Sequence, residues 1–171
     1  MIEKVISGGQ TGADQAGLRA AVKCGISTGG WLPNGCITLA GADASLLDRY
    51  GMMEHTGGYA VRTEANVKDS DGTVRFAKTF KSAGEKCTLR AIKWFGRPYF
   101  DVDAADPPDH DDMVNWILDN NIKTLNVAGN AEETASGIGD FVYEYLIKVF
   151  SDVRIHGLKC ETKYESDFRQ D

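Results

Sequence analysis

A glycine-rich turn near the N-terminus contains the residue types that anion binding requires. The turn consists of Ser7, Gly8, Gly9, Gln10, Thr11 and Gly12. It follows the apolar pair Val5-Ile6, and Asp14 then opens a helix-forming stretch. Glycines let backbone N–H groups converge, hydroxyls add donors, and a helix N-terminus attracts negative charge. We therefore expect a phosphate-binding turn between a strand and a helix, with a glycine turn capped by Thr11 or Asp14 as the structural alternative.

Two familiar phosphate motifs are excluded for this turn. A P-loop needs Gly-Lys followed by Ser or Thr, and no such run follows Gly12. A dinucleotide fingerprint needs Gly-x-Gly-x-x-Gly with an acidic residue about 20 positions later, which is also missing. The turn therefore predicts a phosphate site of another kind.

A second polar cluster precedes the apolar stretch that ends at Ala77. Its members are Arg62, Asn66, Asp69, Ser70, Asp71, Gly72 and Thr73. A guanidinium can pair with a phosphate, and carboxylates can hold a metal ion or a sugar hydroxyl. The Asp-x-Asp-Gly-Thr run also matches the phosphatase nucleophile motif of haloacid dehalogenases, but no buried apolar strand precedes it. A simple turn is as consistent with these residues as a ligand site.

A third loop repeats the arrangement of the N-terminal turn. Gly129 and Asn130 close an apolar stretch, and the run from Ser136 to Gly139 precedes another helical pattern. Two loops of this kind can face one ligand. Glu132 and Glu133 lie between them, where a carboxylate could accept hydrogen bonds from a base or ribose, and a solvated loop is the alternative.

The acidic run around His110 predicts helix capping rather than a metal site. Six aspartates lie between Asp101 and Asp112. Asp106 precedes two prolines, and acidic residues in a first helical turn complement the helix dipole. We therefore expect Asp106 to be the N-cap of a helix and expect no metal.

The elements that must position these residues alternate between strand and helix patterns. Strands are predicted at 2–6, 73–77, 98–102 and 123–127, and helices at 14–24, 85–95, from Asp106 to about 118, and at about 139–150. Residues 26–66 read as loops with short strands. The fold class is therefore α/β, a Rossmann-like three-layer domain with a mostly parallel sheet, in which ligands bind at the carboxyl ends of the strands.

The domain is expected to cover residues 1–150, with 151–171 as a polar C-terminal tail of irregular structure and a short extra strand at 153–155. The net charge of −6 argues against nucleic-acid binding. No apolar run reaches membrane-spanning length, and the four scattered cysteines predict neither a disulfide framework nor a zinc site. The cytoplasm is the expected location.

Four motifs, in order, resemble one family. They are Ser7 to Asp14, Gly29-Gly30-Trp31-x-Pro33-x-Gly35, Arg62-Thr63-x-x-Asn66-Val67-x-Asp69-Ser70-Asp71-Gly72-Thr73, and Leu125 to Gly129. Over about residues 2–150 the chain is similar to the putative molybdenum carrier family, the circularly permuted YpsA-like proteins of the SLOG superfamily. The resemblance implies a Rossmann-like fold and a bound nucleotide or molybdenum cofactor. It places the phosphate on Gly8, Gly9, Thr11 and Gly12, beside Arg62 and Asp71-Gly72-Thr73.

Two departures from the family pattern remove positive charge. Asn130 and Ala131 stand where the family usually has proline and arginine, and Cys36 stands where it usually has arginine. The resemblance therefore implies a weaker hold on an anion or a different ligand.

Three functions stay open at this point. The chain is a carrier or binding protein for a phosphate-bearing small molecule, a phosphoribohydrolase of the LOG type with Asp14, Glu132 or Glu133 as its carboxylate, or a regulatory ligand sensor. The superfamily also implies a homo-oligomer. Whether the protein is an enzyme is not decided by its sequence.

Overall fold

The computed structural model describes the backbone of residues 1–167 and the side chains as far as Ile155. The strands are β1 (Lys4–Ser7), β2 (Ser27–Gly29), β3 (Trp31–Leu32), β4 (Ile37–Thr38), β5 (Gly41–Ala42), β6 (Met53–Glu54), β7 (Gly72–Ala77), β8 (Tyr99–Asp103) and β9 (Thr124–Gly129). The helices are α1 (Ala13–Lys23), the 3-10 turn η1 (Asn34–Cys36), α2 (Ser45–Tyr50), α3 (Tyr59–Lys68), α4 (Ala83–Phe95), α5 (His110–Asp119) and α6 (Ile138–Asp167).

The central sheet is parallel throughout. Its order is β2-β1-β9-β7-β8, so β9, the last strand in sequence, lies between β1 and β7. Two small pairs, β3 with β6 and β4 with β5, lie outside it. This confirms the predicted α/β, Rossmann-like fold with a sheet between helical layers.

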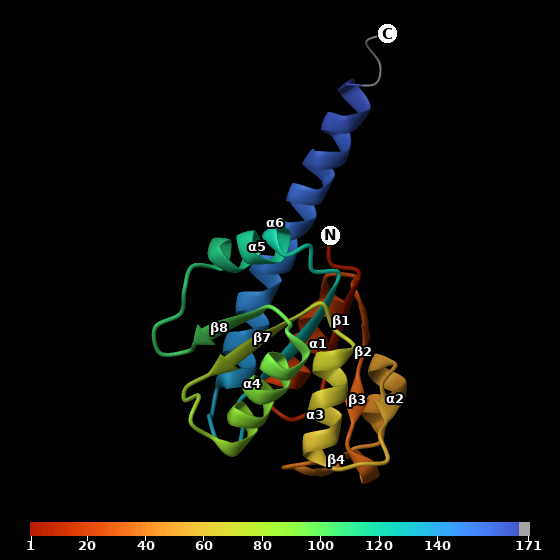
Figure 1. The fold of residues 1–171 in the computed structure, drawn as a ribbon, viewed down its shortest axis with the longest axis vertical. Coiled ribbons are helices and arrows are strands. Elements are labelled where there is room, and N and C mark those ends of the chain that lie inside the picture. The colour runs from red at the N-terminus through yellow and green to blue at the C-terminus, as the bar shows by residue number, and fades with distance from the viewer. Residues whose placement is uncertain (168–171) are drawn as a thin grey trace.

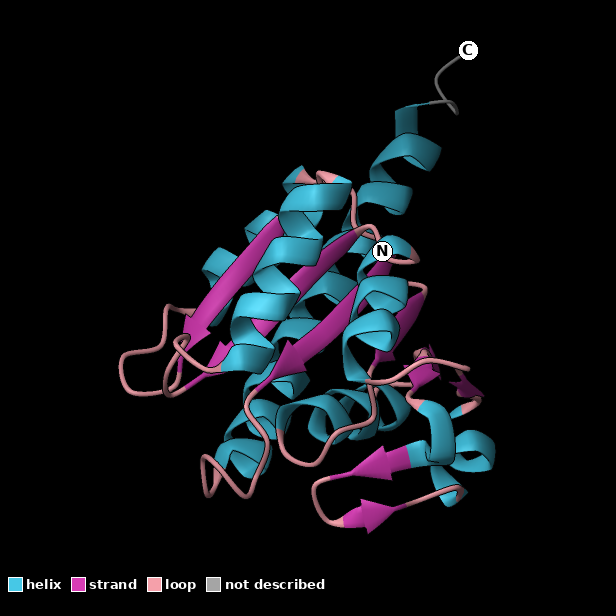
Figure 2. Ribbon diagram, turned by 60° about the horizontal axis from the view of Figure 1, so that its bottom comes forward, coloured by secondary structure: helices cyan, strands magenta, loops and turns pink. Residues whose placement is uncertain are grey.

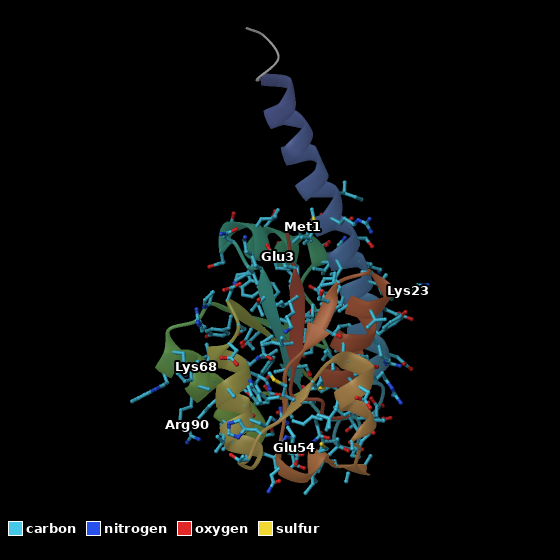
Figure 3. The ribbon with its side chains drawn as sticks, turned by 90° about the vertical axis from the view of Figure 1, so that its right-hand side faces the viewer. Met1, Glu3, Lys23, Glu54, Lys68 and Arg90 are labelled. Atoms are coloured by element: carbon cyan, nitrogen blue, oxygen red, sulfur yellow. The ribbon has the colours of Figure 1, made fainter. Side chains whose placement is uncertain are left out.

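The two faces of the sheet differ in polarity. On one face, Val74 and Phe76 of β7 pack with Leu125 and Val127 of β9 in a large apolar cluster that includes residues of α1, α5 and α6. On the other face, α3 and α4 contribute a much smaller cluster, Val67, Ala91 and Ile92 with Phe95 beside them. Figure 2 shows the strands of the sheet with helices before and behind them. In Figure 3, Lys68 of α3 and Arg90 of α4 lie on one side of the molecule and Lys23 of α1 on the other.

The prediction of irregular structure with a short strand in the C-terminal tail was wrong. No strand forms at 153–155, because α6 continues through residue 150 to Asp167 and projects beyond the body of the domain (Figure 1). Val149 and Val153 are both buried and lie four residues apart, so the apolar face of the helix extends past the predicted end. Residues 168–171 of the predicted tail lie outside the described residues.

Two other helix predictions need correction. Residues 59–68 form α3 rather than a loop, so Arg62, Thr63 and Asn66 are helical. The N-cap of α5 is Asp109 and not Asp106, since the Asp109 side chain accepts a hydrogen bond from the Asp111 N–H at 3.2 Å. Within the described residues, no helix is both long and apolar enough to cross a membrane.

Candidate functional site

A cavity of about 500 Å³ opens at the carboxyl edge of the sheet, where β7 and β9 end. We call it the edge cavity. It is lined by Gln10, Asp14, Leu39, Tyr59, Ala60, Arg62, Thr63, Thr79, Ser82, Ala83, Gly84, Glu85, Cys87, Thr88, Ala128, Gly129, Asn130, Ala131 and Thr134. Most of these residues come from the N-terminal turn and the start of α1, from α3, from the β7–α4 connection and the first turns of α4, and from the end of β9 and the loop after it; Leu39 lies between β4 and β5. Ligands of open parallel sheets bind at this edge.

Arg62 and Asp14 form an ion pair on the cavity wall. Arg62 Nη1 lies 3.4 Å from Asp14 Oδ2, and the two side chains are 12% and 4% exposed. The guanidinium stands over Gly8, where a Cβ atom would collide with it, and over the ring of Tyr59. The Nε of Arg62 is buried without a hydrogen-bond partner in the described structure. Among the described residues that line the cavity, Arg62 carries the one positive charge.

The backbone N–H groups of the glycine turn form an anion site, and nearby side chains already accept their hydrogen bonds. The N–H of Gln10 donates to Asp14 at 3.2 Å, and the N–H of Gly8 also bonds to this carboxylate. The N–H of Gly9 donates to the Ser7 hydroxyl, and the N–H of Thr11 donates to the Gln10 side chain. Burial raises the pKa of Asp14, against the opposing effects of Arg62 and of the turn N–H groups. Asp14 therefore occupies the place in which a phosphate was predicted.

The turn and the loop after β9 touch directly, as the two-loop prediction requires. A Cβ on Gly12 would lie 2.6 Å from the Asn130 carbonyl oxygen and 2.6 Å from the Glu132 N. The N–H of Ala13 donates to the same carbonyl at 3.1 Å. Gly12 has a φ of +78°, in the left-handed region that favours glycine. The absence of a side chain here lets the two loops form one wall.

Glu85 is a second buried carboxyl in the edge cavity. Its Oε1 accepts a hydrogen bond from Asn130 Nδ2 at 3.2 Å, and its Oε2 lies 3.6 Å from Arg75 Nη1. Burial raises the pKa of Glu85 to about 7, assisted by the negative charges of Asp14 and Asp101 and opposed by Arg75. Arg75 is itself held by Asp101, which accepts from its Nε at 2.8 Å.

The other two predicted carboxylates lie outside the cavity lining. Glu132 accepts hydrogen bonds from the N–H groups of Gly137 and Gly139, which lower its pKa, so it caps the start of α6. Glu133 accepts a short hydrogen bond from the Thr11 hydroxyl. Of the three carboxylates proposed from the sequence, Asp14 alone lines the edge cavity.

The second polar cluster is split by the fold. Arg62 reaches the cavity, but Asp69, Ser70, Asp71, Gly72 and Thr73 lie near the amino end of β7, away from its lining. Asp71 accepts from the N–H groups of Lys123 and Thr124, at 3.0 and 2.7 Å. The predicted wall of Asp71-Gly72-Thr73 beside the turn therefore does not form, because the opposite end of the strand faces the ligand edge.

Asn66 and Asp69 instead anchor Trp31. Asn66 accepts from the Trp31 N–H at 2.9 Å and donates to its carbonyl at 3.1 Å, while Asp69 accepts from the indole N–H at 2.8 Å. The Ser70 hydroxyl donates to the Val67 carbonyl, and the Thr73 hydroxyl accepts from Asn126. These contacts are structural and hold the β3 segment against α3.

Seven residues between Thr79 and Thr88 line the cavity, and they were not predicted from the sequence as site residues. Ser82 and Glu85 have the spacing of a capping box, Ser-x-x-Glu, directly after the predicted strand at 73–77. Ser82 does cap α4, since its hydroxyl accepts from the Glu85 N–H at 3.2 Å. A strand followed by a capped helix start is the signal that could have placed this segment at the ligand edge.

Comparison with known proteins agrees with this architecture. Residues 5–150 match the sequence model of the circularly permutated YpsA SLOG family. The chain belongs to this family. Its similarity to the putative molybdenum carrier protein from Syntrophus aciditrophicus, a crystal structure at 1.45 Å, extends over 87% of this chain and 94% of that one, with 32% identity and a TM-score of 0.78. A comparison with curated proteins gave no match. The resemblance predicted from the four motifs is thereby confirmed.

The departures from the family pattern take structural roles in this SLOG family member. Asn130 Oδ1 accepts from the Lys78 N–H at 2.9 Å, and its Nδ2 faces Glu85. Cys36 is buried against Leu32 and Leu46 in a small apolar cluster. Ala131, at the usual arginine position, lines the edge cavity, and neither it nor Cys36 supplies a positive charge there.

Proposed function

We propose that this protein binds a phosphate-bearing, nucleotide-like small molecule in the edge cavity. The observation that carries the proposal is Arg62, whose buried Nε has no hydrogen-bond partner among the described residues and whose guanidinium lies on the cavity wall. A guanidinium offers a phosphate more than one hydrogen bond at once. The first turn of α4, which also lines the cavity, adds a helix N-terminus for the same charge.

The charge of the cavity limits the negative charge that a ligand can carry. Asp14 and Glu85 offset the one cation, so a ligand with a single phosphate and otherwise neutral groups fits better than a polyphosphate. Burial raises the pKa of Glu85 to about 7, so near neutral pH part of this carboxyl is neutral, which reduces its repulsion of a phosphate.

The test is equilibrium binding of nucleoside monophosphates, inorganic phosphate and a phosphorylated pterin by calorimetry. We expect a monophosphate to bind to the unaltered protein, and Arg62→Gln to weaken binding by about tenfold or more, because a charged hydrogen bond contributes about 1.5–3 kcal/mol. Arg90→Gln, on the exposed side of α4 and outside the cavity lining, is the matched control. Absence of binding across the panel, or equal binding to Arg62→Gln, would contradict the proposal.

Carriage of molybdenum cofactor is a narrower form of this proposal, supported by the name of the Syntrophus structure. The residues present fit the phosphate of such a pterin, which Arg62 would hold, and Asp14 and Glu85 could accept from its ring N–H groups. The bound group would supply the molybdenum itself. Native mass spectrometry of protein from a host that makes the cofactor should show a pterin adduct; a retained nucleotide without pterin would reject carriage and keep the binding site.

A second function is favoured by the pairing of Asp14 and Glu85 in one cavity. Cleavage of a base from a nucleoside monophosphate uses a carboxylate to stabilise positive charge on the ribose and an acid to protonate the leaving base. A carboxyl with a pKa near 7, as Glu85 has, suits the second task. Chromatography of a nucleoside monophosphate panel should then show free base, and its absence from every reaction would eliminate this activity.

A further inference from the structure

The outward side of α4 is basic. Lys86, Arg90 and Lys93 are exposed and recur every three or four residues, so they lie on one side of the helix. Glu85, the one acidic residue of α4, is on the buried side. Within the part of the chain that the structure describes, none of the three cations lies in an ion pair. The helix dipole accounts for Lys93, which is in the last turn, but not for the other two.

Trp94 shares this side of the helix and is 82% exposed, a higher fraction than any other exposed large apolar side chain of the described residues. An open groove of about 490 Å³ is lined by Trp94, Leu89 and the three cations. We call these five residues the basic α4 face. Tryptophan buries most of its surface in an average protein and is enriched at protein interfaces. An indole this exposed, among unpaired cations, indicates a surface that another molecule covers.

The positive charge continues past the end of the helix. Arg97 Nη2 donates to the Lys68 carbonyl at 2.8 Å, which joins the ends of α4 and α3. Lys68 is exposed and lies on the same side of the molecule as Arg90 (Figure 3). The chain as a whole has a net charge of −6. The basic α4 face is therefore a positive region on a negative molecule, and electrostatic complementarity calls for a negative partner.

The size of the face favours a short acidic segment over a polyanion or a membrane. Lys86 and Lys93 are about 10 Å apart along the helix axis, the length of about three residues of extended chain. A nucleic acid would reach beyond the face onto a molecule of negative net charge. A helix that binds a membrane buries its apolar side in the lipid, but the apolar side of α4 already packs inside the protein.

We propose that the basic α4 face docks an acidic segment of another protein, in which carboxylates flank an apolar side chain that packs on Trp94. Tryptophan and arginine are the residue types that most often dominate the energy of a protein interface. No residue of the face lines the edge cavity, so this docking is separate from the binding of a small molecule there.

The test uses a fluorescein-labelled peptide in which glutamates flank a pair of leucines, and the same peptide with glutamine in place of glutamate. Fluorescence anisotropy should show binding of the acidic peptide to the unaltered protein, and binding of the glutamine peptide should be weaker by about tenfold or more. Lys86→Glu combined with Lys93→Glu should weaken binding of the acidic peptide by about tenfold or more, because attraction at two positions becomes repulsion. Trp94→Ala should weaken it by a similar factor, because the apolar anchor is lost.

The matched control is Lys23→Glu combined with Lys148→Glu, which makes the same charge change at exposed positions of α1 and α6. Lys23 lies on the opposite side of the molecule from Arg90 (Figure 3). This variant should bind the acidic peptide nearly as well as the unaltered protein does. Thermal unfolding shows whether each variant is folded, and an AMP titration by calorimetry should give the same result for all of them, since none of these residues lines the edge cavity.

The outcomes that contradict the proposal are distinct from those that concern the edge cavity. Failure of the acidic peptide to bind, equal binding of the glutamine peptide, or undiminished binding to the folded variant with both Lys86→Glu and Lys93→Glu would each overturn it. Self-association in sedimentation velocity, binding to phosphatidylserine vesicles, or binding to single-stranded DNA would do so too, if that variant lost it while the acidic peptide did not bind. A lack of AMP binding would leave this proposal unaffected.

Discussion

At the scale of single residues, Asp14 occupies the anion site that the glycine turn forms. The turn has the backbone of an anion site, yet the anion in it is the carboxylate of Asp14, held by the N–H groups of Gly8 and Gln10 and by Arg62. A phosphate bound as proposed would therefore lie beside Arg62, outside the turn.

Replacement of Asp14 by alanine should both weaken the fold and create an anion site. Removing one partner of a buried ion pair costs about 3–5 kcal/mol in unfolding free energy. The vacated turn would then present unpaired N–H groups beside Arg62, so added inorganic phosphate should raise the melting temperature of Asp14→Ala more than that of the unaltered protein. Asp140→Ala, an exposed carboxylate in the first turn of α6, serves as the control. Equal phosphate responses in all three proteins would contradict this account of the turn.

Glu85 predicts a pH dependence of stability. Its folded pKa of about 7 lies above the ordinary value of 4.5, so between these limits the folded state binds more protons than the unfolded state. Stability should therefore fall as the pH rises from about 4.5 to 7, by up to about 3 kcal/mol from this group. Asp14, with its pKa also raised, acts in the same direction.

Urea unfolding of the unaltered protein and of Glu85→Gln at pH 5 and pH 8 measures this effect. The glutamine variant should lose less stability between the two pH values. Glu64→Gln, which changes the same charge on an exposed site, should follow the unaltered protein. A pH profile of Glu85→Gln identical to that of the unaltered protein would show that Glu85 does not titrate in this range.

At the scale of elements, the close contact of two loops builds the site. Gly12 precedes α1, and its Cα packs against the backbone of residues 130–132. Gly58 precedes α3 in the equivalent N-cap position, but it has a negative φ and open space where a Cβ would stand. The two glycines therefore offer a matched comparison.

Gly12→Ala should destabilise the protein by about 2–4 kcal/mol, because the new methyl group meets backbone atoms and φ is positive. It should also weaken ligand binding, since it pushes Asn130 away from the turn. Gly58→Ala should cost less than about 1 kcal/mol. Urea unfolding and the AMP titration of both variants test these values. Similar losses in the two variants would mean that the contact between the loops is not tight.

Some of the helices and strands could be predicted from the sequence and others could not. The core strands and the helices α1 and α4 were predictable, because apolar periodicity and terminal glycines such as Gly25 and Gly96 mark them. Helix α3 was not, since it buries little besides Asn66 and Val67 and so has almost no apolar stripe.

Site residues that come at the carboxyl end of a strand could be predicted from the sequence. Residues whose place depends on which end of a strand they occupy, or on where a side chain points, could not. Gly129 ends β9, Asn130 follows it, and both line the cavity. Asp71 has equally suggestive chemistry, but it precedes β7 and lies at the other edge of the sheet. Glu85 was missed because its carboxyl is turned from its helix by Asn130, a contact between residues 45 positions apart.

At the scale of the whole molecule, we expect the α3–α4 layer to be bound to the sheet more weakly than the opposite layer. It covers Thr73, Arg75 and Asn126, which are buried and polar, and its apolar cluster is small. The layer of α1, α5 and α6 rests on the large apolar cluster, with Leu146 and Val149 fully buried. Burial of apolar area provides most of the stabilisation, so the two layers should differ in local stability.

Hydrogen exchange measured by mass spectrometry should detect this difference. Without ligand, amides of α3 and α4 should exchange faster than those of β9 and of α6 up to residue 153. Both α3 and α4 line the edge cavity, so a molecule bound between Arg62 and Glu85 connects them and makes their opening more costly. Saturating AMP should therefore slow exchange in α3 and in the first turns of α4, and leave β9 and α6 nearly unchanged. Slow exchange of α3 and α4 without ligand, equal to that of β9, would show that the polar face holds this layer as firmly as the apolar core holds the other.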